Sequence, residues 1–91
     1  MENTILTAIV AEVRAEMQIS PSIPDTVFTN YVKEGEQFLN HLAESLRIDF
    51  DGDLMARALL KNYVRYAYYG ALADFKKAYQ GDIYDTQIRY L

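Results

Sequence analysis

The chain has 91 residues, a formal net charge of −4 and no cysteine. A sequence of this length makes one domain, residues 1–91, and the lack of cysteine excludes disulfides, thiolate metal sites and a thiol nucleophile. The acidic balance disfavours a general attraction to nucleic acid or to an anionic membrane surface.

The first predicted helix covers residues 4–17. Apolar residues recur there at helical spacing, namely Leu6, Ile9, Val10, Val13 and Met17. Charged residues interrupt this segment and no basic stretch precedes it, which argues against both a signal peptide and a membrane span. We therefore expect a soluble protein that resides in the cytoplasm.

Two prolines, Pro21 and Pro24, end that helix, and the second helix begins just after them. Ser22 and Asp25 have the spacing of a capping box. We expect the helix to run to about Leu46.

One broad face of this second helix should form the centre of the core; it carries Phe28, Tyr31, Gly35, Phe38, Leu42 and Leu46. Inside this face Gly35 predicts the close approach of another helix's backbone, whereas a surface position would make the glycine harmless.

A loop with three alternating aspartates follows at residues 47–53. Gly52 breaks the helical period, and Asp51 or Asp53 is placed to cap the next helix. A calcium site is rejected, because the glycine comes too early for an EF-hand loop and the twelfth position, counted from Asp49, is Leu60. Capping and loop solvation are the favoured uses.

The third helix should start at Leu54, reach about Tyr69 and bend or restart at Gly70, before continuing to Tyr79. Its predicted core face holds Ala56, Leu59, Leu60, Tyr63, Val64, Tyr66, Ala67 and Ala71. Gly81 is a natural helix end, and the last ten residues show no useful amphipathic pattern. The predicted fold is all-α: a small bundle of four to five helices with a long third helix and a short C-terminal tail.

Opposite the core face, Arg57, Lys61 and Arg65 form a basic ridge at four-residue intervals, and Tyr68 continues it. Tyr69 lies on a third face. Like charges at this spacing repel, so the ridge destabilises the fold unless acids nearby or on another chain pair with it. It is either a solvated helix face or an interface. The interface hypothesis predicts that reversing Lys61 and Arg65 weakens assembly without loss of helix.

Charge is also divided along the chain. Residues 1–46 contain seven acids and two bases, a net charge of −5, whereas residues 54–77 contain five bases and one acid, a net charge of +4. Such complementary surfaces suit head-to-tail packing of identical copies, although two solvated faces of a monomer fit equally well.

Tyrosine is concentrated in the same half: seven of the eight tyrosines lie between Tyr63 and Tyr90. A domain of this size should not hide so many rings, so some are expected to meet a partner. No phosphate loop, nucleophile elbow or zinc-protease motif occurs, and His41 stands alone and is expected to be structural. We therefore predict no catalytic residue, no metal and no cofactor.

The order of these parts resembles the small helical head-tail connector proteins of tailed bacteriophages, the adaptors that form a ring beneath the portal. The strongest likeness lies in "DLMARALLKNYVRYAYYGALADFKKAYQGDIYDTQI", with a capped helix, a small-residue "GAL" turn, then "DF" and an aromatic before an apolar tail. The helix pair joined at "ISPSIPD" and ending in "RIDF" resembles the family more weakly, and the basic ridge with Tyr68 is not matched to the family pattern.

The resemblance implies a non-enzymatic virion protein at the head-tail junction, present in the host cytoplasm before assembly. About a dozen copies would form a ring on the portal protein and present a platform for the next head-completion or tail protein. The genome would pass through the channel without sequence-specific binding, and isolated subunits can be monomeric. The family's C-terminal portal contact maps onto Ile83, Tyr84, Ile88, Tyr90 and Leu91.

Two alternatives remain. A helix-turn-helix protein would read a DNA groove through Arg57, Lys61 and Arg65. A monomeric helical interaction module would use the tyrosines on one partner.

Overall fold

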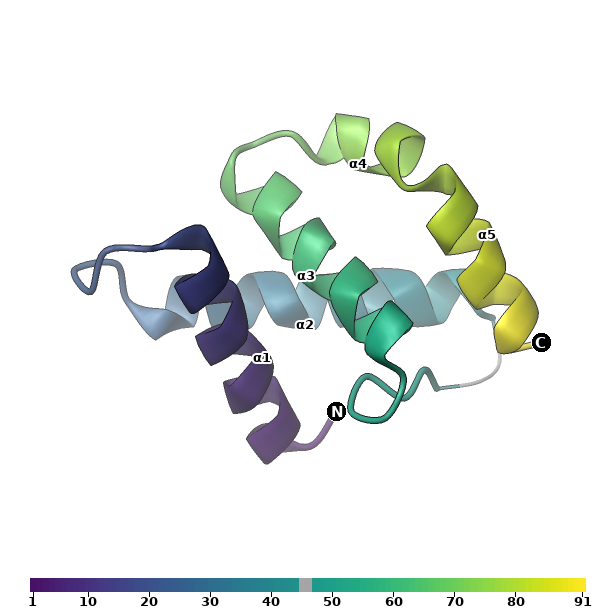
Figure 1. The fold of residues 1–91 in the computed structure, drawn as a ribbon, viewed down its shortest axis with the longest axis horizontal. Helices are drawn as coiled ribbons and strands as arrows, with labels where there is room; N and C mark the ends of the chain where they lie inside the picture. The colour runs from purple at the N-terminus through teal and green to yellow at the C-terminus, as the bar shows by residue number, and fades with distance from the viewer. Residues whose placement is uncertain (45–46) are drawn as a thin grey trace.

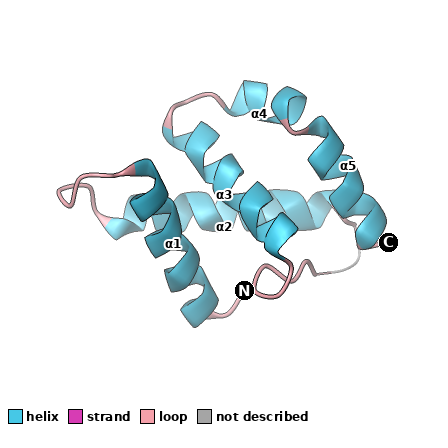
Figure 2. Cartoon of the chain, viewed as in Figure 1, coloured by secondary structure: helices cyan, strands magenta, loops and turns pink. Residues whose placement is uncertain are grey.

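Five helices make up the secondary structure of residues 1–44 and 47–91, the part that this computed structural model describes. They are α1 (Asn3–Met17), α2 (Asp25–Leu42), α3 (Leu54–Tyr68), α4 (Leu72–Ala78) and α5 (Gln80–Arg89). Loops and turns join them, and no strand occurs among the described residues (Figure 2). The all-α prediction is confirmed. None of the described helices has the length and apolar character needed to cross a bilayer.

The longest helix, α2, lies behind α1 and α3 (Figure 1). It packs against both of them, and α1 also contacts α3. The short α4 folds back beside α3, and α5 then returns past α3 and α2. The first three helices therefore form the core of the domain, and the last two cover one end of it.

The buried face of α1 is the predicted one: Leu6, Ile9, Val10 and Val13 are all buried. The buried face of α2 is rotated from the prediction and consists of Phe28, Val32, Gly35 and Leu39. The predicted residues Tyr31, Phe38 and Leu42 are only partly buried. Val32 and Leu39 were missed because the large rings beside them dominated the apolar pattern, and Leu46 lies outside the described residues.

Gly35 does mark a close approach of α3, although side chains rather than backbone make it. A Cβ at Gly35 would lie 2.6 Å from Leu60 Cδ1 and 2.8 Å from Tyr63 Cδ1. We expect Gly35→Ala to lower the free energy of unfolding by about 1 kcal/mol, because overpacking outweighs the gain in helix propensity.

The matched control is Gly81→Ala. A Cβ at Gly81 meets nothing within 4 Å, so this change should raise stability by about 0.5 kcal/mol. Urea denaturation of both variants measures the difference. A stabilised Gly35→Ala variant would contradict the close packing.

Of the two predicted helix caps, the structure confirms the one at Asp53 and contradicts the one at Ser22. Asp53 caps α3, since its carboxylate accepts a hydrogen bond from the Ala56 amide at 3.1 Å. The capping box at Ser22 was wrong: α2 begins after Pro24 with no side-chain cap, and the Ser22 hydroxyl hydrogen-bonds with the hydroxyl of Ser20 instead. Two residues before the N-cap, Ser22 lies too far from the first free amides of α2.

The helix ends also differ in part. α2 stops at Leu42, and Glu44 has a φ of +67°, so the predicted end was too late; residues 45–46 are outside the described part. The break at Gly70, with a φ of +69°, is confirmed. Gly81 does not end a helix, because α4 stops at Ala78 and α5 includes Gly81.

The last ten residues form most of α5 rather than an unstructured tail. Thr86 is buried, and Ile83 and Tyr90 pack against the core. Tertiary contacts therefore stabilise a helix that is too short to form alone in water.

Candidate interaction surfaces

The cations of the basic ridge on α3 form ion pairs with two acids of α1 in the same chain. Arg57 donates from Nε to Glu12 at 3.0 Å and makes a second hydrogen bond to the same carboxylate. Lys61 lies 3.3 Å from Glu12 and 2.7 Å from Glu16, and Arg65 donates to Glu16 at 2.7 Å. These residues form an ion-pair ladder between the two helices.

The ladder shifts the titration of its most enclosed pair. The hydrogen bond from Arg57 lowers the pKa of Glu12, burial opposes this shift, and Lys61 adds to the lowering. The hydrogen bond to Glu12 in turn raises the pKa of Arg57. Both directions indicate that the pair stays ionised, so the charge of the ridge does not require a partner chain.

A charge-reversal series tests the ladder. We expect Lys61→Glu with Arg65→Glu to lower the free energy of unfolding by about 1–2 kcal/mol, because two partly exposed pairs become repulsive contacts with Glu16. Adding Glu16→Lys should restore most of the loss in thermal denaturation. Unchanged stability of the double variant would show that the ladder contributes nothing to the fold.

Most of the tyrosines belong to two clusters of packed aromatic rings. Tyr68 stacks on buried Phe28 with ring centroids 5.1 Å apart. Phe75 is 1% exposed and lies within an aromatic cluster. Its ring centroid is 5.3–6.3 Å from the centroids of four rings: Tyr79, Tyr63, Tyr66 and Phe38. The concentration of rings in the second half of the sequence thus serves largely to attach α4 to α3 and α2.

Two tyrosines are exposed by contrast. Tyr69 is 69% exposed at the end of α3, and Tyr84 is 64% exposed on α5. The expectation that some rings meet a partner therefore concerns these two residues.

The residues predicted at the C-terminal contact divide into two sets. Ile83 packs against the core, and the Tyr90 hydroxyl donates to Asp53 at 2.8 Å. Tyr84, Ile88 and Leu91 remain exposed. The second set is therefore the part of the predicted contact that is largely open to a partner in the folded chain.

Two hollows adjoin this exposed set, on either side of Tyr84. One, which we call the α4–α5 groove, has a volume of about 380 Å³, apolar walls from Leu42, Ile83 and Tyr84, and a rim with Lys76 and Lys77. The other, the C-terminal patch, is lined by Ile88 and Leu91 beyond Tyr84 and measures about 290 Å³. The structure thus places a continuous apolar surface along α5.

Asp53 links α5 to the start of α3 through hydrogen bonds and an ion pair. Besides capping α3, its carboxylate pairs with Arg89 and accepts the Tyr90 hydroxyl, while the Asp49 amide donates to the same Tyr90 oxygen. Burial raises the pKa of Asp53, but the hydrogen bonds from the Ala56 amide, Tyr90 and Arg89 lower it more. One carboxylate therefore positions the exposed apolar surface.

Some of these features escaped the sequence reasoning. Glu12 and Glu16 have the same four-residue spacing as the basic ridge, which was a usable signal for the ladder. The partners of Asp53, more than 30 residues away, gave no such signal. Leu54 and Met55, 73% and 62% exposed, were also missed.

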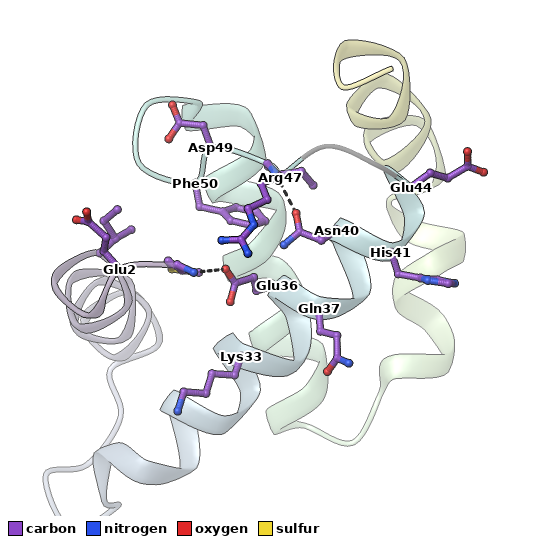
Figure 3. A pocket seen from close by; sticks show the side chains of 13 residues that line it. Glu2, Lys33, Glu36, Gln37, Asn40, His41, Glu44, Arg47, Asp49 and Phe50 are labelled. Atoms are coloured by element: carbon purple, nitrogen blue, oxygen red, sulfur yellow. Dashed lines mark hydrogen bonds and ion pairs between the residues drawn. The ribbon is translucent and has the colours of Figure 1, made fainter.

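A wide hollow of about 1010 Å³ lies between the start of α1, α2 and residues 47–50 (Figure 3). Asn40 accepts from the Ile48 amide at 2.9 Å, and the Met1 ammonium pairs with Glu36 at 2.8 Å. Charges of both signs surround it, and His41 extends away from Glu36 and Asn40 (Figure 3). Among the described residues no three His, Asp or Glu side chains gather as metal ligands.

No family model matches the chain, and no curated protein or solved structure shows significant similarity to it.

Proposed function

We propose that the protein is a head-tail connector, a structural component that assembles as a ring on a phage portal. The observation that carries this proposal is the apolar surface formed by Tyr84 and Ile88 of α5 and by Leu91 just after it, all of which are exposed. Contiguous exposed apolar residues on a small domain indicate a contact with another macromolecule. The sequence resemblance supplies the identity of that macromolecule.

The position of this surface supports the connector hypothesis over the helix-turn-helix alternative. Arg57, Lys61 and Arg65, the cations that the alternative assigns to the DNA groove, are already paired with Glu12 and Glu16. Phosphate contacts would compete with these ion pairs. The C-terminal patch needs no such rearrangement, because Tyr84, Ile88 and Leu91 are already 64%, 50% and 88% exposed.

Copurification with the portal protein encoded by the same genome tests the proposal. We expect the wild-type chain to remain with a tagged portal, and Ile88→Asp with Leu91→Ser to be lost from it. Lys33→Glu, an exposed change on α2, is the matched control and should be retained. A wild-type chain that stays monomeric in the presence of the portal would count decisively against this function.

A further inference from the structure

The α4–α5 groove is an apolar slot with a positive rim. Lys76 and Lys77 are exposed at its edge, while Leu42, Ile83 and Tyr84 line its walls. A segment that fills it should combine apolar side chains with negative charge.

The start of α3 has this composition. Leu54 and Met55 are among the most exposed large apolar residues of the chain, and they follow the exposed acids Asp49 and Asp51. The loop before them is held in shape, because the Asp49 carboxylate accepts hydrogen bonds from the amides of Asp51 and Gly52 at 3.1 and 2.9 Å. We call these four residues, Asp49, Asp51, Leu54 and Met55, the acidic knob.

The acidic knob and the α4–α5 groove do not meet within one chain. Neither Leu54 nor Met55 lines the groove, and both side chains remain largely open to solvent. The two surfaces belong to different elements, the start of α3 and the junction of α2, α4 and α5. They can combine only between copies.

We propose that the acidic knob of one copy docks into the α4–α5 groove of the next. Burial of Leu54 and Met55 against Tyr84 and Leu42 supplies the apolar contact, and Lys76 and Lys77 face Asp49 and Asp51. The proposal rests on the proposed function, since it names the contact between neighbours in the ring. It assigns that contact to surfaces other than the pairs with Glu12 and Glu16, to which the acidic knob is linked through Asp51, 3.6 Å from Arg57.

Two different surfaces make a head-to-tail interface. A dimer formed in this way keeps one free knob and one free groove, so the association continues until a ring closes or the chain of copies ends. Tyr84 and Leu42 line both hollows, so the part of the C-terminal patch that stays outside this contact and available to the portal is Ile88 and Leu91.

Two variants, each changed at exposed residues, test the contributions of the two surfaces separately. The knob variant, Leu54→Ser with Met55→Gln, retains the Asp53 cap. The groove variant, Lys77→Glu with Tyr84→Ser, leaves Lys76 in place over the Phe38 ring. Lys33→Glu serves again as the charge control, and circular dichroism checks that each variant is folded.

Sedimentation velocity of the purified chain measures the outcome. We expect wild type and the control to self-associate as concentration rises to about 1 mM, and each surface variant to lose at least about tenfold in association constant. A mixture of the two variants should form a one-to-one dimer that grows no further. The intact knob of the groove variant docks into the intact groove of the knob variant, and no intact surface is then left free.

Three results would overturn the inference: a wild-type chain that is monomeric at about 1 mM, a surface variant that associates like wild type, or a mixture that fails to form the dimer. The first result combined with portal copurification would leave the proposed function standing. Self-association without portal binding would instead remove the function and keep the interface.

Discussion

Replacing Phe75 by alanine is expected to lower the free energy of unfolding by about 3–5 kcal/mol. The side chain is 1% exposed and touches rings from α2, α3 and the end of α4, so its removal leaves a cavity that none of these helices can close alone. Urea denaturation followed by circular dichroism gives the change.

The control for this experiment is Leu72→Ala, in the same helix. Leu72 is 38% exposed, so its loss should cost under about 1 kcal/mol. Equal effects of the two substitutions would mean that the aromatic cluster is not the attachment of α4.

Asp53→Ala should lower the free energy of unfolding by about 2–3 kcal/mol, the largest effect that we expect of a polar residue in this chain. The substitution removes the cap of α3, leaves the Tyr90 hydroxyl without its acceptor, and leaves Arg89 with Asp85 as its remaining carboxylate partner. Hydrogen exchange should show faster opening of α5 than of α1. Asp51→Ala, at a side chain 68% exposed, is the matched control and should change stability little.

The same carboxylate predicts a pH dependence. Its pKa in the folded protein lies below the ordinary value of 3.8, so the stability that it contributes is present above about pH 4 and is lost as pH falls through the lower folded value. Asp53→Asn removes the charge, and the gap in stability between wild type and this variant should therefore shrink below pH 4. A gap that stays constant to pH 2 would show that the charge of Asp53 does not matter.

The helices with strong local patterns could be predicted from the sequence, and those that depend on distant contacts could not. The apolar repeat of α1 and the Asp53 cap of α3 involve residues within a few positions of one another. α5 was missed because its anchors, Asp53 and the core, are distant from it in the sequence. Local signals therefore placed α1 to α4, including the restart after Gly70, and missed the helix that carries the exposed surface.

In the candidate site, too, local patterns could be predicted from the sequence and distant contacts could not. The basic ridge was recognised as a charged face that needs acids, but a sequence does not show whether those acids lie on α1 or on another chain. The structure places Glu12 and Glu16 opposite it. Tyr84, Ile88 and Leu91 were selected through the family resemblance, and their exposure is a consequence of how α5 is anchored.

The partition of the tyrosines also has a practical consequence. The chain contains eight tyrosines and no tryptophan, so its intrinsic ultraviolet emission comes from phenol rings alone. Tyr84 is one of two such rings open to water, and it stands between the α4–α5 groove and the C-terminal patch. Quenching by iodide, compared between wild type and Tyr84→Phe, would report occupancy of this surface without an attached dye.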